Sequence, residues 1–204
     1  MLRGVLVCAL VLLAAVAWAK EAPSVHSRVW TDRYDRYFRK YTKRYFGPLF
    51  DWQWFKAQGI AESGLNPKAR SKTGAIGIMQ ILPSTFREIR KLNPVIENLY
   101  DPEWNIAAGI FYDRYLYRKW DYPVPTRDRL LLTFASYNAG FGAVMRAKKK
   151  AQADPPLFER LEPYLPKQAR NYVSRILLLK REQRRRRLRG LEKYLASAQS
   201  SSGA

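Results

Sequence analysis

The chain has 204 residues, of which 47% are hydrophobic and 14% aromatic, and this length predicts one ordinary domain with short extensions. Its formal net charge of +20 predicts an anionic partner. With one cysteine, Cys8, and one histidine, His26, the chain lacks the residues for a disulfide framework or a thiolate metal site. His26 follows an apolar leader, where a solvated linker residue is expected. We therefore expect no metal and no cofactor.

The first residues have the pattern of a secretory signal peptide. Arg3 precedes an apolar run over residues 5–16, and Ala17-Trp18-Ala19 forms an A-x-A cleavage site. A retained membrane anchor is the weaker alternative, because the run is shorter than the roughly 20 residues that span a bilayer. A lipid-modified cysteine is also weaker, since Cys8 lies inside the run. We expect export to the periplasm or cell envelope.

Export decides which anionic partner to expect. Removal of the leader takes away only Arg3, so the mature chain stays strongly basic. An exported protein meets little nucleic acid, whereas cell-wall polymers and lipid headgroups carry negative charge. Nucleic-acid binding is therefore not expected, and it would require the signal peptide to be misinterpreted. The arginine-rich end of the chain is a candidate for docking on an anionic wall or membrane surface, although a solvated helix end is an equal alternative.

The first expected helix of the mature chain covers residues 31–46. It places Tyr34, Tyr37, Tyr41 and Tyr45 on one face at three- and four-residue spacing, bordered by cations. Packing on the domain is favoured over a sugar-stacking surface. A second helix is expected over 49–61, followed by a loop or short hairpin over 71–82. The remaining helices are expected over 83–92, 101–119, 126–140 and 142–151, and from 169 onward.

These segments predict a mostly α fold with four parts. Residues 1–19 form the signal peptide, and residues 20–48 a linker with the basic aromatic helix. Residues 49–182 form the catalytic domain. A basic, partly disordered tail occupies 183–204.

Glu62 is the strongest candidate for chemistry. It falls at the predicted C-terminal end of an apolar helix, where the helix dipole and hydrophobic neighbours both disfavour the carboxylate and raise its pKa. A carboxylic acid that stays protonated near neutral pH can donate a proton to a glycosidic oxygen. Asp51 lies eleven residues earlier, about 16 Å along a helix, which is too far for a catalytic partner. Ser63 has no nearby histidine to activate it as a nucleophile.

Three motifs follow one another along the chain: AESGLNP at 61–67, GAIGIMQILP at 74–83 and SYNAG at 136–140. Together with Ser71 they closely resemble the soluble lytic transglycosylase (SLT) family of the goose-type lysozyme-like superfamily. The resemblance covers about residues 50–180. It implies a lysozyme-like α-helical domain with a short loop or hairpin beside the active-site cleft.

The resemblance also implies a reaction. Glu62 would protonate the β-1,4 bond between N-acetylmuramic acid (MurNAc) and N-acetylglucosamine (GlcNAc) in peptidoglycan. The resulting carboxylate would then take the proton of the muramoyl C6 hydroxyl as that oxygen attacks the anomeric carbon. The product is a 1,6-anhydro sugar, and no water is consumed.

The same resemblance implies roles for six further residues. Ser71 and Gln80 would line the cleft, Met79 would pack beneath the sugar, and Tyr137 with Asn138 would position Glu62 and the acetamido group. Tyr172 is the sixth, in Asn171-Tyr172-Val173. Simpler alternatives remain for three of them: Met79 as plain core, Ser71 as a turn residue and Asn138 as a helix cap.

One departure from the family pattern concerns a second acid. Many relatives carry a glutamate four residues before the tyrosine at 172, whereas this chain has Gln168. Two other functions remain open: a lysozyme-type hydrolase, and a non-catalytic peptidoglycan-binding or assembly protein. Retention of Glu62, Gln80 and Tyr137 favours the enzyme. We expect a monomer that acts on peptidoglycan glycan strands.

Overall fold

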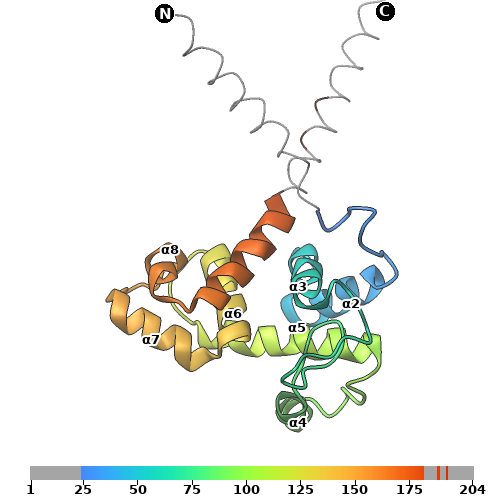
Figure 1. Ribbon diagram of the computed structural model, residues 1–204. Coiled ribbons are helices and arrows are strands. Elements are labelled where there is room, and N and C mark those ends of the chain that lie inside the picture. The colour runs from blue at the N-terminus through green and yellow to red at the C-terminus, as the bar shows by residue number, and fades with distance from the viewer. Residues whose placement is uncertain (1–23, 182–187, 189–191, 193–204) are drawn as a thin grey trace, which may run out of the picture.

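A computed structural model describes residues 24–181 together with Leu188 and Glu192, so the expected signal peptide and most of the basic tail lie outside it. Helices dominate the described residues, which confirms the predicted mostly α fold (Figure 1). Among these residues, no helix is both long and apolar enough to cross a membrane. The elements are α2 (Asp35–Phe46), α3 (Gln53–Ser63), α4 (Pro83–Leu92), α5 (Pro102–Lys119), α6 (Thr126–Ala139), α7 (Phe141–Ala151), α8 (Phe158–Leu161), η1 (Glu162–Tyr164) and a helix over 167–181.

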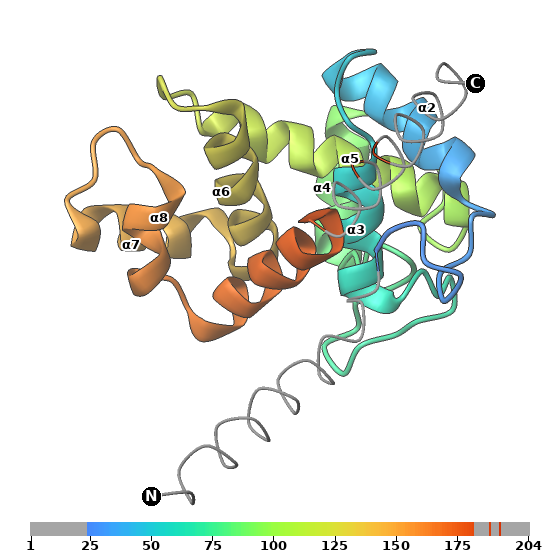
Figure 2. The same cartoon turned by 90° about the horizontal axis from the view of Figure 1, so that it is seen from above.

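Helix α5 is the element around which the others pack. It extends across the molecule, with α2 and α3 above it and α4 below it in Figure 1, and α6 and α7 group near its C-terminal end. The view from above shows helix 167–181 running from α8 back toward α3 (Figure 2). Ile106, Ile110 and Leu116 of α5 are buried, so this helix contributes to the core along its length.

The start of α5 has a side-chain cap followed by a proline. Asp101 accepts hydrogen bonds from the backbone amides of Glu103 (2.8 Å) and Trp104 (3.1 Å), and Pro102 occupies the first helical position. Helix α6 differs, because it begins at Thr126 and the preceding Pro125 has no side chain that can cap the helix.

The aromatic stripe of α2 serves packing. Phe38 and Tyr41 are buried, and the ring of Tyr45 meets Phe111 of α5 edge-on with centroids 5.4 Å apart. Lys40 lies on the exposed side and pairs with Glu103 at 2.7 Å. The helix therefore contributes its rings to the core and its cations to the surface, as the packing interpretation predicted.

Residues 64–82 form the loop expected beside the cleft. Its regular structure is limited to isolated antiparallel bridges, Arg70 with Ile76 and Ile76 with Ile81. The side chain of Asn105, buried in α5, holds this loop in place. Its Oδ1 accepts from the Met79 amide at 2.8 Å, and its Nδ2 donates to the carbonyls of Ile76 and Leu99, both at 3.0 Å.

Gly77 permits this close approach of loop and helix. A Cβ at Gly77 would lie 2.5 Å from Nδ2 of Asn105, and the φ of +79° is one that side-chain-bearing residues rarely adopt. The loop backbone can therefore reach the Asn105 amide only with glycine at this position.

Asn105→Ala should lower the free energy of unfolding by about 2–4 kcal/mol, because it leaves one buried amide and two carbonyls without their partner. Chemical denaturation would measure the loss. Asn98→Ala is the matched control, since exposed Asn98 only accepts from the Tyr100 amide, and it should change stability by about 0.5 kcal/mol or less. Equal effects of the two substitutions would contradict this account of the loop.

Candidate active site

Glu62 lies in the last turn of α3, as the sequence predicted. Gly64 ends the helix in a left-handed conformation, with its amide bonded to the carbonyl of Ile60 at 2.9 Å. Burial raises the pKa of the Glu62 carboxyl from its ordinary value of 4.5 to about 7, although a hydrogen bond from Tyr172 acts in the opposite direction. The carboxyl is therefore partly protonated at neutral pH.

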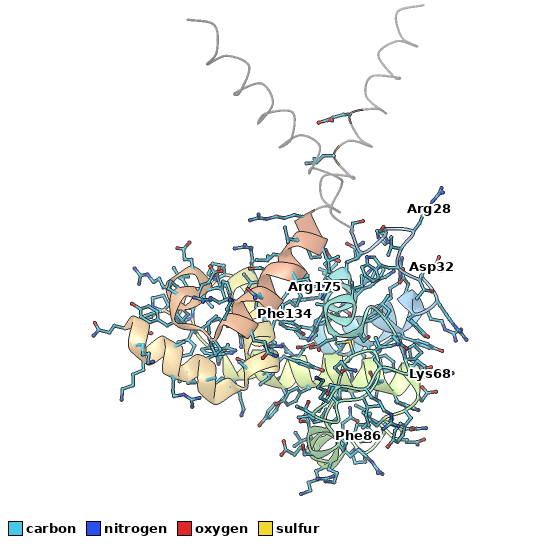
Figure 3. All side chains as sticks on the ribbon, in the orientation of Figure 1. Arg28, Asp32, Lys68, Phe86, Phe134 and Arg175 are labelled. Atoms are coloured by element: carbon cyan, nitrogen blue, oxygen red, sulfur yellow. The ribbon has the colours of Figure 1, made fainter. Side chains whose placement is uncertain are left out.

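The Tyr172 hydroxyl donates to Oε1 of Glu62 at 2.6 Å. Tyr172 comes from helix 167–181, more than one hundred residues away in sequence. Arg175, labelled in Figure 3, is on the same helix, and its Nη1 donates to the carbonyl of Ala61 at 3.5 Å. This helix therefore contacts the end of α3 both at the carboxyl and at the backbone beside it.

Met79 and Gln80 form the turn that faces this helix end. Met79 is fully buried against α5, and Gln80 has a positive φ of 47°. The Gln80 amide group donates to the carbonyls of Gly77 (2.9 Å) and Ala69 (3.3 Å), which fixes its orientation. Tyr137 of α6 donates its hydroxyl to the Met79 carbonyl at 2.8 Å. The residue that contacts Glu62 is therefore Tyr172, while Tyr137 supports the opposing turn.

Ser63 joins α3 to the same turn. Its hydroxyl donates to the carbonyl of Ile78 at 2.8 Å and accepts from the Asn66 amide at 3.1 Å. Both bonds are structural, in keeping with the prediction that Ser63 is no nucleophile. The end of α3 and the 78–80 turn are thus held together next to Glu62.

Ser71 and Asn138 have less contact with the end of α3 and the 78–80 turn. The Ser71 hydroxyl accepts from the Ala75 amide at 2.9 Å and pairs with Thr73 at 2.8 Å, so in this state it acts as a turn residue. Asn138 follows Tyr137 on α6, and its buried Oδ1 has no hydrogen-bond partner.

The sequence analysis missed a buried polar pair one turn before Glu62. Gln58 of α3 and Asp113 of α5 are both fully buried, and Nε2 of Gln58 donates to Oδ1 of Asp113 at 3.2 Å. Burial, and then the nearby charge of Glu62, raise the pKa of Asp113 well above its usual range. Burial therefore favours the uncharged form of Asp113. Asn105, Gly109 and Asp113 follow one another at four-residue spacing, and this helical period could have indicated the burial of Asp113.

Two other acids, Asp51 and Glu103, make their contacts with residues other than Glu62. Asp51 is exposed and pairs with Lys180, and Glu103 is held by Lys40 and by the Tyr41 hydroxyl at 2.8 Å. Gln168, which replaces the second family acid, is exposed on helix 167–181. Within the described residues, the acidic chemistry near the 78–80 turn thus rests on Glu62.

The chain is similar in sequence to known proteins. The chain is 32% identical over 155 residues to a membrane-bound lytic murein transglycosylase F from Shewanella woodyi, and 35% identical over 144 residues to one from Desulfosudis oleivorans. These matches cover 74% and 69% of the chain but only 31% and 30% of the relatives. The chain thus spans about a third of the length of these proteins.

The fold is also that of solved structures. It superposes on the 70 kDa soluble lytic transglycosylase from Escherichia coli with a TM-score of 0.63 and 27% identity, covering 78% of this chain and 25% of that one. The sequence profile of the family described as the transglycosylase SLT domain matches residues 37–156, more than half of the chain. The protein therefore belongs to the transglycosylase SLT domain family.

Proposed function

We propose that the protein is an exported peptidoglycan lytic transglycosylase that cleaves the MurNAc-GlcNAc β-1,4 bond and forms 1,6-anhydro-MurNAc. Glu62 gives its proton to the glycosidic oxygen while the bond from that oxygen to the anomeric carbon breaks. The Glu62 carboxylate then takes the proton of the C6 hydroxyl as its oxygen bonds to the same carbon. Glu62 ends the cycle protonated, so one carboxyl serves both steps.

The observation that carries this proposal is the position of the Glu62 carboxyl in the last turn of α3, where the Tyr172 hydroxyl donates to it at 2.6 Å and burial raises its pKa to about 7. A group that acts first as an acid and then as a base works best when its pKa lies near the pH of the reaction. An exposed glutamate would be ionised at that pH and could not protonate the leaving oxygen. Burial at the end of α3 supplies the required shift.

The surroundings of Glu62 favour an internal attack over hydrolysis. A lysozyme-type hydrolase that works through two carboxyls, with inversion or retention at the anomeric carbon, needs a second carboxyl that faces the substrate. Asp113, the buried acid that interacts electrostatically with Glu62, is fully inaccessible and hydrogen-bonded to Gln58. It therefore has no surface with which to hold an attacking water.

The remaining site residues have roles consistent with their positions. We assign to Tyr172 the orientation of the Glu62 carboxyl, and to Gln80, Met79 and Ser71 the wall of the cleft opposite it. Tyr137 fixes the 78–80 turn through the Met79 carbonyl, and we assign to Asn138, which follows it on α6, the positioning of the acetamido group. The names of the relatives support murein as the substrate and the cell envelope as the location.

The products released from purified peptidoglycan test the reaction directly. Mass spectrometry should find muropeptides that end in 1,6-anhydro-MurNAc with the wild-type protein and none with Glu62→Gln, which lacks the transferable proton. Reducing ends would indicate a lysozyme. No release by either protein would favour a binding or assembly role.

The pH dependence of activity should reveal the hydrogen bond that Tyr172 donates to Glu62. Activity should fall as pH rises through about 7, because Glu62 loses the proton it must donate. Tyr172→Phe removes a hydrogen bond that stabilises the carboxylate, so it should raise the Glu62 pKa and move this alkaline limb to higher pH. The loss of orientation should also lower kcat by about tenfold.

Tyr137→Phe is the control for that shift. It removes the hydroxyl that donates to the Met79 carbonyl and leaves the hydrogen bond from Tyr172 to Glu62 intact. The alkaline limb of its pH profile should therefore stay in place even if its kcat changes. An alkaline limb that moves to lower pH in Tyr172→Phe, or that moves equally in both variants, would show that the Tyr172 hydroxyl does not lower the pKa of Glu62.

Glu62→Gln should stabilise the fold near neutral pH. Because the folded-state pKa is raised, the folded protein loses stability relative to the variant as pH rises from about 4.5 to about 7. The gain should be absent at pH 4 and reach about 3 kcal/mol at pH 7 and above. Denaturation across this range measures it, with Glu97→Gln, at an exposed position, as a pH-independent control. A gain that persists at pH 4 would disprove this origin.

A further inference from the structure

Helix 167–181 is attached to the core by apolar residues: it buries Ala169, Val173, Ile176 and Leu179. Burial of apolar surface is non-directional, so it holds a helix against its neighbours without fixing its position along them. The contact of Arg175 with the Ala61 carbonyl, at 3.5 Å, is long for a hydrogen bond and adds little direction. Stronger polar contacts must therefore set where this helix lies along α3.

Lys180 makes such contacts with the start of α3. Its Nζ donates to Oδ2 of Asp51 at 2.5 Å and to Oε1 of Gln53 at 3.2 Å, and it lies 5.2 Å from the centroid of the Trp54 ring. The side chain of Lys180 is only 12% exposed, whereas most lysines in proteins are solvated. These contacts therefore hold the ammonium group in one place.

The two polar partners of Lys180 are themselves fixed. Oδ1 of Asp51 accepts from the Gln53 backbone amide at 3.0 Å, so one carboxylate oxygen binds the first residue of α3 and the other binds Lys180. Burial lowers the pKa of His26, and its neutral ring can accept from Nε2 of Gln53 at 2.9 Å. This bond directs Oε1 of Gln53 toward Lys180. We call Asp51, Gln53 and Lys180 the Lys180 anchor.

The Lys180 anchor and the Tyr172–Glu62 hydrogen bond join the same two helices at two points. Figure 2 shows the end of helix 167–181 beside α3. Lys180 follows Tyr172 by eight residues, about 12 Å of helix, and Glu62 follows Gln53 by nine, about 14 Å. The order of the contacts is reversed along the two helices, so they run antiparallel where they meet. Because the two spans nearly match, a shift of helix 167–181 along α3 would disturb both contacts together.

We propose that Lys180 is a positioning residue for the reaction: with Asp51 and Gln53 it fixes helix 167–181 along α3 so that the Tyr172 hydroxyl reaches Glu62. The inference rests on the proposed function, in which Tyr172 orients the Glu62 carboxyl. Lys180 acts through Tyr172, and it is not a catalytic residue.

The groups that interact electrostatically with Glu62 agree with an effect through Tyr172. They are Tyr172 itself, Asp113 of α5 and Tyr137 of α6, and burial raises the pKa of each of them well above its usual range. The pKa of Glu62 is set by burial and by the Tyr172 bond. Only the Tyr172 bond depends on the position of helix 167–181, so a loosened anchor changes the proton of Glu62 through that bond.

The test measures the pH profile of activity in Lys180→Met and in Asp51→Asn. Methionine keeps the apolar stem of Lys180 without its charge, and asparagine keeps the oxygen that caps α3. Partly exposed ion pairs contribute little to stability, so both variants should fold. Each should lower kcat about threefold with KM unchanged, because the Glu62 carboxyl loses orientation. Each should also move the alkaline limb to higher pH, because a weakened Tyr172 bond stabilises the carboxylate less.

The two variants also separate positioning from a direct effect of charge. Charge alone would raise the Glu62 pKa when the Lys180 cation is removed and lower it when the Asp51 anion is removed. Limbs that move in opposite directions, or that do not move, would overturn the proposal. In the Tyr172→Phe background neither substitution should move the limb further, and a further shift would also overturn it.

Lys167→Met is the matched control, since it makes the same change at an exposed position of the same helix. It should keep the wild-type kcat and alkaline limb, and a loss equal to that of Lys180→Met would contradict the assignment.

A measurement without substrate separates this inference from the proposed reaction. Carbon-13 NMR titration of the glutamate side chains, with Glu62→Gln to identify the signal, gives the pKa of Glu62 in the free protein. This pKa should be higher in Lys180→Met than in wild type. If wild type released no anhydro product, the proposed reaction would fail, while a raised pKa would still support the anchor and an unchanged one would reject it.

Discussion

The burial of one carboxyl is the constraint on which the rest of this structure depends. In the reaction proposed above, Glu62 must be removed from water far enough to hold its proton near neutral pH, yet it must remain open to a glycosidic oxygen. Burial raises its pKa to about 7, and the Tyr172 hydroxyl, at 2.6 Å, limits the rise by stabilising the carboxylate. These opposing effects keep both protonation states accessible, as a cycle that alternates between acid and base requires.

The architecture around α5 supplies the walls of that site from distant parts of the chain. Asn105 fixes the 76–79 backbone on α5, Ser63 joins the same turn to the end of α3, and Tyr137 holds it from α6. Helix 167–181 then brings Tyr172 against the carboxyl. Because each contact joins a different pair of elements, the geometry at Glu62 depends on the packing of the whole domain and not on one local motif.

Local patterns allowed much of this to be predicted from the sequence. The helices expected over 83–92 and 101–119 correspond to α4 and α5, and the expected end of an apolar helix placed Glu62 correctly. The contact of Asn105 with Met79 and the Gln58–Asp113 pair were not predictable, because they join residues 26 and 55 positions apart. The sequence analysis gave the positioning of Glu62 to Tyr137 with Asn138, whereas the hydrogen bond to its carboxyl comes from Tyr172. Two tyrosine hydroxyls compete for the assignment, and only the fold shows that Tyr172 reaches the carboxyl while Tyr137 reaches a carbonyl.

The strong positive charge raises a further question, since a nearby cation would lower the pKa of Glu62 and remove its proton. The chain carries 37 lysine and arginine residues, yet burial and Tyr172 account for the shift at Glu62. Several cations lie over aromatic rings instead, such as Arg39 over Trp52 at 4.4 Å and Arg129 over Tyr117 at 4.3 Å. Arg175, which is close in sequence to Tyr172, directs its guanidinium to the Ala61 carbonyl. The positive charge of the chain therefore does not lower the pKa of the Glu62 carboxyl, and this separation allows a strongly basic protein to keep an acid that holds its proton.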